Sequence, residues 1–182
     1  TFRYKNFDLS VFINGSYGNK VYNYLSMKLT HMNSPWTNQL NAVNGRAQLV
    51  PINPNKVYED GTMWYNDVSN VMVANPGASI PRATINDPND NDRISDRYIE
   101  DGSYIRLKNI SLGYTFPKKT IDKLGLSNLR IYANIQNLLT ITGYDGYDPE
   151  IGASTSSVNV YGLDNGRYPS PTVYSFGLNV SF

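Results

Sequence analysis

Few residues of this 182-residue chain are of the types that catalyse reactions. It has no cysteine, its one histidine is His31, and no serine lies in a GxSxG motif, so no nucleophile with a histidine base is indicated. Glu100 and Asp101 are adjacent carboxylates, but neighbours on a strand point to opposite faces and do not easily flank one glycosidic bond. We therefore expect no catalytic residue and no enzyme activity.

An acidic run has some of the spacing of a cation site. Asp87, Asp90, Asp92 and Asp96 offer oxygen ligands that can converge on calcium. The run lacks the glycine of the sharp turn and the bidentate glutamate of a calcium loop. We expect a solvated, asparagine-rich turn with no metal and no cofactor, and the sequence leaves calcium binding by this loop open. His31, at the end of a predicted strand, is given no special role.

Aromatic residues are unusually frequent, with 15 tyrosines, 6 phenylalanines and 2 tryptophans. Tyrosine suits a boundary with one apolar and one wet side, which is either a membrane interface or a sugar-binding surface. In the predicted loops, such rings either stack against sugars or pack the loop onto itself. The loop candidates are Trp36, Tyr58, Trp64, Tyr65, Tyr144 and Tyr147.

Charge and composition exclude two classes of protein. The formal net charge is +1, with 16 basic and 15 acidic residues, and the longest basic run is the pair Lys118 and Lys119, so nucleic-acid binding is not expected. No stretch has the ~20 consecutive apolar residues of a membrane-spanning helix. The opening TFRYKNFDLSVF has the pattern of a strand interior, so we expect Thr1 to mark the start of a fragment.

Five segments alternate apolar with small or polar side chains, which is the period of two that a strand produces. In the third segment the apolar residues change phase, which either a bulge near Asn109 or a rim standing clear of a membrane explains. The predicted strands span residues 2–14, 20–30, 103–116, 128–141 and 172–182.

The lengths of the connections alternate as well. The stretches 31–102 and 142–171 are long, whereas those after the first and third predicted strands are short. Bacterial transmembrane barrels combine short periplasmic turns with long extracellular loops, and their strands face lipid on one side and a wet lumen on the other. We therefore predict an all-β fold, a segment of an antiparallel transmembrane β-barrel with both long loops extracellular.

Two alternatives remain at this point. A secreted β-sandwich that binds carbohydrate also has strands with one apolar face, but it needs turn signals every ~8 to 12 residues. A passive porin shares all of the barrel physics.

Particular segments narrow the choice by resemblance. They resemble the C-terminal region of the SusC/RagA family of TonB-linked outer-membrane transporters. The resemblance extends over nearly all of residues 1–182. The matching segments are YKNFDLSVFINGSYGNKVYNYL at 4–25, EDGSYIRLKNISLGYTFPKK at 100–119, LRIYANIQNLLTITGYDGYDPE at 129–150, YP at 168–169 and the closing GLNVSF.

This resemblance implies the last five strands of a 22-stranded TonB-dependent receptor barrel, with a plug and a TonB-contacting segment upstream. Family members import glycans or oligopeptides, are energised through TonB, and work with a SusD-like surface lipoprotein that closes over the mouth. The implied setting is the bacterial cell outer membrane, with its lipid and its assembly machinery as further partners. The loop aromatics would then contact substrate or the lid.

The final strand resembles the terminal assembly signal of outer-membrane proteins. An aromatic residue ends the chain, and apolar residues precede it at every second position. The residues of this signal are Tyr174, Phe176, Leu178, Val180 and Phe182. No pattern in the sequence indicates the substrate, the oligomeric state or the identity of the lid.

Overall fold

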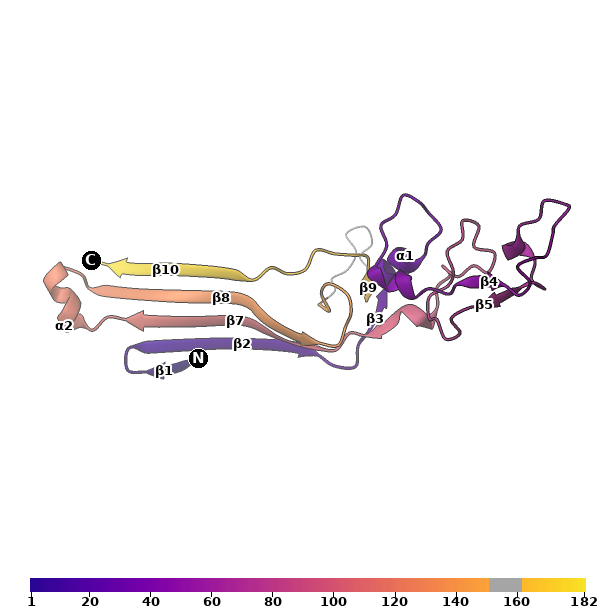
Figure 1. The fold of residues 1–182 in the computed structure, drawn as a ribbon. Coiled ribbons are helices and arrows are strands. Elements are labelled where there is room, and N and C mark those ends of the chain that lie inside the picture. The colour runs from indigo at the N-terminus through magenta and orange to yellow at the C-terminus, as the bar shows by residue number, and fades with distance from the viewer. Residues whose placement is uncertain (151–161) are drawn as a thin grey trace. The chain divides into compact units, whose positions relative to one another are not determined.

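A computed structural model describes residues 1–150 and 162–182, and it shows mostly antiparallel strands with few helices (Figure 1). The predicted all-β class is confirmed. The chain forms two compact units, one made of Thr1–Asn23 with Ile99–Phe182 and one made of Tyr24–Tyr98. None of the helices in the described residues is both long enough and apolar enough to cross a membrane.

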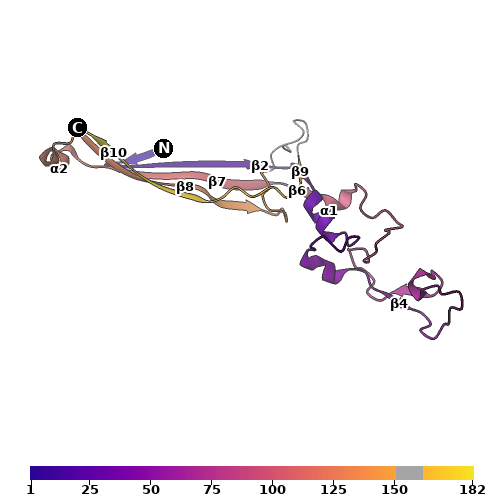
Figure 2. The same cartoon turned by 90° about the horizontal axis from the view of Figure 1, so that it is seen from above.

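The first unit is built on a 5-stranded sheet with the order β1-β2-β7-β8-β10, in which all neighbours are antiparallel. Figures 1 and 2 show the long strands side by side, with α2 and the C-terminus at the same end. The strands are β1 (Phe2–Tyr4), β2 (Phe7–Ser16), β7 (Tyr104–Thr115), β8 (Asn128–Thr142) and β10 (Val173–Ser181).

The predicted strand over 2–14 is wrong in one respect, because it is two strands. β1 turns back onto β2 at Lys5 and Asn6, with Lys5 at a φ of 51° and Phe2 paired with Leu9. Asn6 ties this turn to the end of β7, since its side-chain amide donates to the Thr115 carbonyl at 2.8 Å. Alternation alone does not reveal a reversal this tight, because the apolar pattern continues through it.

The predicted strand over 20–30 is also wrong. β3 (Lys20–Asn23) ends after four residues, and α1 (Tyr24–Thr30) follows directly. Met27 and Thr30 are buried at helical spacing, and Leu, Met and Lys favour helices. Over such a short stretch, apolar residues at alternate positions fit a helix and a strand almost equally well. β3 lies outside the main sheet and pairs with β6 (Ile99–Asp101) and β9 (Leu163–Asp164).

The predicted bulge near Asn109 is confirmed. Against β2, the register of β7 shifts between Leu107 and Asn109, and Lys108 is the extra residue. Against β8 the register shifts at the same place, but there β8 has the extra residue, because Asn137 and Leu138 lie opposite Lys108. Val11 and Ile13 are on one face of β2, and they pair with Ile110 and Leu107. The bulge therefore returns the apolar residues of β7 to a single face.

The remaining elements are short. In the second unit, β4 and β5 form an antiparallel pair, so the predicted loop 31–102 contains ordered elements. The connection between β7 and β8 holds α2 and η4, and η4 is followed by Gly125, whose φ is 71°. The bounds are η1 (Asn41–Gly45), β4 (Leu49–Pro51), η2 (Trp64–Asn66), β5 (Val71–Val73), η3 (Asp96–Tyr98), α2 (Lys118–Ile121) and η4 (Asp122–Leu124).

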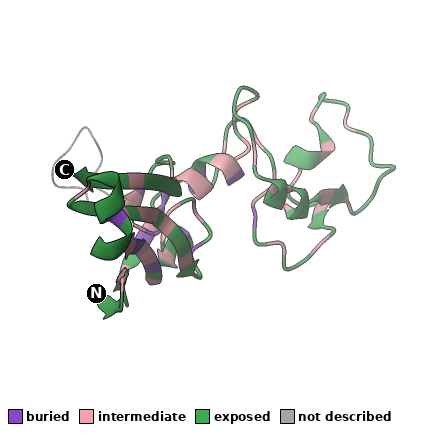
Figure 3. Ribbon diagram, turned by 90° about the vertical axis from the view of Figure 1, so that its left-hand side faces the viewer, coloured by how far each residue is buried: buried purple, intermediate pink, exposed green. Residues whose placement is uncertain are grey.

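The strands of the main sheet are mostly exposed or half-buried (Figure 3). Large apolar side chains of β10 illustrate this, with Phe176 83% and Leu178 60% exposed. Full burial occurs instead near the small sheet, where Val21 of β3 is 2% exposed. A sheet with so much uncovered apolar surface requires a covering medium or partner.

Gly15 is predicted to be the glycine of the main sheet that least tolerates a side chain. A Cβ there would lie 2.6 Å from the backbone oxygen of Tyr104, so the strands would have to separate. Gly15→Ala should destabilise the full-length protein by about 1–3 kcal/mol, measured by urea unfolding in detergent. Gly143→Ala is the control, since no described atom lies within 4 Å of its added Cβ. Equal midpoints for the two variants would contradict the prediction.

Candidate functional site

One face of the main sheet is apolar across β2, β7, β8 and β10. The register aligns Leu9, Leu112, Ala133 and Phe176 in one row. The two flanking rows are Val11, Ile110, Ile135 and Tyr174, and Phe7, Tyr114, Ile131 and Leu178. Four of the five residues proposed as a terminal signal, Tyr174 to Val180, thus belong to one continuous apolar surface.

Aromatic rings gather on this surface near the short connection between β7 and β8. Tyr114 contacts Phe7 with ring centroids 4.7 Å apart, and it contacts Phe116 edge to face at 5.0 Å. Aromatic girdles of this kind flank the apolar band of transmembrane barrels.

The opposite face of the sheet is polar. Ser10, Ser111, Asn134 and Ser175 form one row. Nearer the short connections, Arg130 Nη2 donates to Asp8 Oδ2 at 2.6 Å.

Glycines make room for large polar side chains on this face. A Cβ on Gly113 would lie 2.2 Å from Arg130 Nη2, and one on Gly177 would lie 2.1 Å from Cζ of Tyr132. The small residues of the strands therefore allow a guanidinium and a phenol to lie flat against the sheet.

A cluster of charges, here called the loop anchor, holds the segment after β8 against β7. It consists of Arg106, Lys108, Asp148 and Glu150. Arg106 is 3% exposed, donates to Asp148 Oδ1, and donates to Glu150 Oε2 at 2.7 Å. Lys108 Nζ donates to Glu150 Oε1 at 2.5 Å. The DPE sequence at 148–150 thus shapes the loop.

Asp148 also closes the far end of the same loop. Its Oδ2 accepts the backbone N–H of Ser170 at 3.0 Å, and its Oδ1 accepts that of Glu150 at 3.0 Å. Burial acts to raise the pKa of Asp148, but the hydrogen bonds from Arg106 and these amides outweigh it and hold the pKa below its ordinary value. The carboxylate is therefore ionised where it meets Arg106.

Tyr144, one of the predicted ligand-contact residues, is buried. It is 6% exposed, and its hydroxyl donates to Asp164 Oδ2 at 2.6 Å. Asp164 is 2% exposed and accepts a second hydrogen bond from the Gly166 amide at 2.8 Å. Burial first, and then the Asp164 carboxylate, raises the pKa of Tyr144. The hydroxyl of Tyr144 is engaged within the chain, so this tyrosine stabilises the loop.

Tyr144→Phe is expected to destabilise this loop by about 1–3 kcal/mol, because it leaves one oxygen of the buried Asp164 without its donor. Hydrogen exchange of peptides covering 142–150 and 162–168 should become faster. Tyr147→Phe is the control, since Tyr147 is 62% exposed. Unchanged exchange in both variants would show that the buried hydrogen bond adds nothing to loop stability.

Beside the loop anchor lies a hollow of about 490 Å³. Its lining carries both signs of charge and includes Tyr168, and the charged lining residues are Lys108, Arg167, Asp148, Glu150 and Asp164. Tyr168 is 83% exposed. In the sequence, Tyr168 was part of the family resemblance only, and no local pattern marked the hollow.

The other predicted aromatic residues do not form one site. Trp36 is 93% exposed, whereas the Tyr58 hydroxyl donates to Asp67 at 2.9 Å and accepts from Asn70 at 2.9 Å. Trp64 packs edge to face on Tyr65, with ring centroids 5.6 Å apart. Tyr58 and Trp64 are thus half-buried within their own unit. Tyr65 contacts Trp64 but is 44% exposed, and the rings of Trp36 and Tyr147 are exposed further still.

The adjacent carboxylates Glu100 and Asp101 have separate structural partners. Glu100 accepts hydrogen bonds from the Asn23 side chain at 2.8 Å and from the Asp145 amide at 3.2 Å. Asp101 pairs with Lys20 at 3.5 Å. Each of the two carboxylates therefore stabilises local structure at the sheet of β3, β6 and β9.

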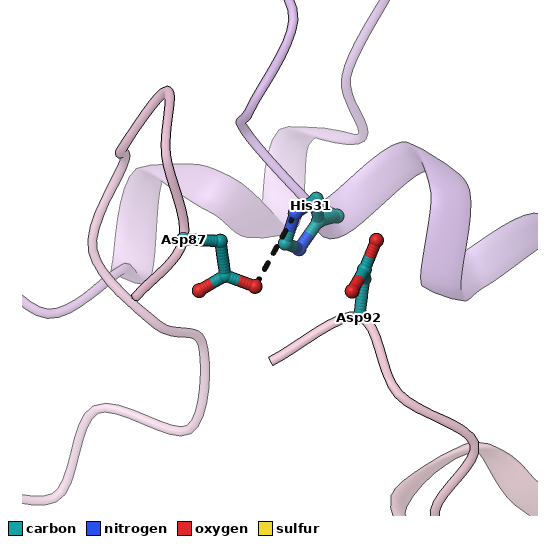
Figure 4. A group of neighbouring side chains, drawn as sticks. All are labelled: His31, Asp87 and Asp92. Atoms are coloured by element: carbon teal, nitrogen blue, oxygen red, sulfur yellow. Dashed lines mark ion pairs between the residues drawn. The ribbon is translucent and has the colours of Figure 1, made fainter. Parts of the chain in front are cut away.

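His31 follows a helix and not a strand, and it lies in a cluster that the sequence did not predict. One ligand atom each of His31, Asp87 and Asp92 lies within 4.8 Å of the others (Figure 4). The three residues come from two segments that are distant in sequence, so no local spacing signals the arrangement.

Comparisons with known proteins agree with this architecture. The chain is 35% identical over 185 residues to TonB-dependent receptor P3 of Formosa agariphila, a match covering 99% of this chain and 15% of the relative. It is 36% identical over 93 residues to TonB-dependent receptor SusC of Bacteroides thetaiotaomicron, covering 50% of this chain and 8% of SusC. No family model matches the chain.

Among solved structures, the RagAB peptide transporter superposes with a TM-score of 0.64 at 19% identity, over 97% of this chain and 16% of that chain. This likeness concerns the fold. The strand pattern and the matches define the class, a segment of a TonB-dependent receptor barrel. Within that class the chain is a SusC/RagA-like segment. It spans only 15% of the length of TonB-dependent receptor P3 and 16% of the RagAB chain that it matches.

Proposed function

We propose that the chain forms part of the barrel wall of a TonB-dependent importer in the bacterial outer membrane. The importer takes up glycans or oligopeptides together with a SusD-like surface lipoprotein, and it is energised through TonB by a segment outside this chain. The complete barrel has 22 strands and encloses a plug. The observation that supports this most directly is the apolar face that continues across β2, β7, β8 and β10, opposite a polar face.

The connections support the same proposal. β1 turns into β2 within two residues, and β7 reaches β8 through 12 residues, 116–127, whereas β2 to β7 and β8 to β10 take long connections. In an antiparallel sheet the two short connections share one end and the two long ones the other. Short periplasmic turns and long extracellular loops follow this rule in bacterial barrels.

Within the loops, we assign contact with the lipoprotein or the substrate to the residues whose rings are free, Trp36, Tyr147 and Tyr168. Exposed aromatic rings stack on sugars and anchor protein interfaces. The mixed charges of the hollow beside the loop anchor suit the two termini of an oligopeptide. The likeness to the RagAB peptide transporter gives the peptide alternative a precedent.

The proposal is tested on the full-length protein in its own cells. Membrane fractionation and heat-modifiable migration on a gel should locate a folded barrel in the outer membrane, and deletion of Phe182 should reduce it. If the full-length protein is soluble and its amount is unchanged by deletion of Phe182, the result would instead support the sugar-binding β-sandwich.

A second measurement separates the importer from a passive porin. Uptake of labelled oligosaccharides and oligopeptides should stop when TonB is removed, and a porin would continue to conduct them. Affinity purification of the full-length protein should recover a surface lipoprotein. The double variant Trp36→Ala, Tyr147→Ala should recover less of it. Tyr58→Ala, which removes a ring held inside its own unit, should recover as much as the wild type.

A further inference from the structure

His31, Asp87 and Asp92 converge within the unit Tyr24–Tyr98, and the proposed transport function uses none of them. His31 directly follows α1, and the two aspartates bracket the turn at 88–91. The ligand atoms of all three lie within 4.8 Å of one another. Figure 4 shows the imidazole between the two carboxylates.

The Nε2 atom of His31 is buried and lacks a hydrogen-bond partner. The side chain of His31 is 10% exposed, and no group in the described part of the chain hydrogen-bonds to its Nε2. This atom lies 3.6 Å from Asp87 Oδ2, which is longer than an N–H···O hydrogen bond of ~2.7–3.2 Å. Buried polar atoms are almost always satisfied, so an atom in this position requires a partner.

The spacing fits two ligands of one cation. Zinc binds nitrogen and carboxylate oxygen at about 2.0–2.2 Å in tetrahedral geometry, which places two ligand atoms about 3.4 Å apart. The observed 3.6 Å is close to this separation. A cation would also offset the repulsion between the two neighbouring carboxylates.

Asp87 is oriented for this role by its own turn. Asn91 donates its backbone N–H to Asp87 Oδ2 at 2.5 Å and its side-chain amide to Oδ1 at 2.6 Å. Each carboxylate oxygen has a further lone pair, so both hydrogen bonds are compatible with coordination. Groups that fix a ligand in this way are a regular part of metal sites. Arg82 lines the same small cavity, but no ion pair joins it to either aspartate within residues 1–150.

We propose that His31, Asp87 and Asp92 bind one divalent transition-metal ion, with water completing the coordination. The ion that we expect is zinc. The donor set decides between cations. Calcium and magnesium take oxygen ligands, whereas an imidazole with two carboxylates suits zinc. The bound ion joins the end of α1 to the 87–92 turn and so fixes this part of the loop region.

The test uses the full-length protein, purified in detergent, stripped with a chelator and dialysed against zinc. Metal content is measured by mass spectrometry, and affinity by zinc titration calorimetry. Asp92→Asn and His31→Gln should each lose about one zinc equivalent, with at least about a 10-fold weaker affinity. Asp90→Asn is the matched control, because Asp90 is exposed, lies outside the cluster, and has a φ of 54° that asparagine adopts readily.

Equal zinc content in all variants would overturn the proposal, as would displacement of zinc by equimolar calcium. Heat-modifiable migration checks that each variant folds. A further measurement needs no variant: zinc should slow hydrogen exchange in wild-type peptides covering 27–33 and 85–94, and unchanged exchange there also refutes the site. Neither readout depends on transport, so failure here is distinct from failure of the importer proposal.

Discussion

Arg106→Met is expected to destabilise the full-length protein by about 3–5 kcal/mol, because it leaves the largely buried Asp148 carboxylate without its charged partner. Asp148 has a side chain only 10% exposed, and Arg106 is 4% exposed in the same measure. The loss should appear in urea unfolding and as faster hydrogen exchange at 144–150 and 162–171, the two stretches that Asp148 connects.

Lys108→Met is the matched control. The Lys108 side chain is 33% exposed and its partner Glu150 is 31% exposed, so this pair should contribute only about 0–1 kcal/mol. Equal losses in the two variants would show that the anchor works through general charge and not through the buried guanidinium.

The anchor should also be sensitive to acid. The pKa of Asp148 is lowered in the folded protein, so its contribution to stability is fully present above the ordinary aspartate value of about 3.9. It is lost as the pH falls through the folded value. The protection of 162–171 against hydrogen exchange, measured relative to the intrinsic exchange rate at each pH, should therefore fall below about pH 4 in the wild type, and Arg106→Met should flatten this dependence.

The second large effect is expected on the apolar face. Ile110→Arg places a charge in the row of Val11, Ile135 and Tyr174, two rows away from the contact between Phe7 and Tyr114. A cationic side chain facing lipid near the bilayer midplane costs about 2–4 kcal/mol. The folded fraction after refolding into lipid vesicles, scored by heat-modifiable migration and urea titration, should fall accordingly.

Ser175→Arg is the control for this change, because Ser175 lies on the opposite face in a row of serine and asparagine. It should refold nearly as well as the wild type. If Ile110→Arg refolds at wild-type yield, or if the two variants are equally impaired, the apolar face does not contact lipid.

The sequence was sufficient to predict a strand where the alternation of apolar and polar residues continues over many consecutive positions. The predicted strands over 103–116, 128–141 and 172–182 correspond to β7, β8 and β10, because each has one face of a single character over many residues. The bulge followed from the change of phase. The helix α1 was missed because seven residues are too few to separate a period of two from one of 3.6.

Contacts between segments that are distant in sequence could not be predicted from the spacing of residues along the chain. The ion pairs of Arg106 and Lys108 join residues 42 and 44 positions apart, and nothing in the spacing selects Asp148 and Glu150 among the other carboxylates. An arginine and a lysine within a strand were a usable signal, since such charges require partners. For His31 even that signal was absent, because one histidine at a loop is unremarkable on its own.

The bulge at Lys108 sets the direction in which the first half of β7 faces. If every residue of β7 were paired in strict alternation, the half of the strand that precedes Lys108 would be rotated by one position relative to the half that follows it. Arg106 would then point out of the apolar face, and Ile105 and Leu107 would point out of the polar face. One unpaired residue thus keeps both the apolar surface and the loop anchor in place, whereas insertions in the connections would leave the frame of the strand intact.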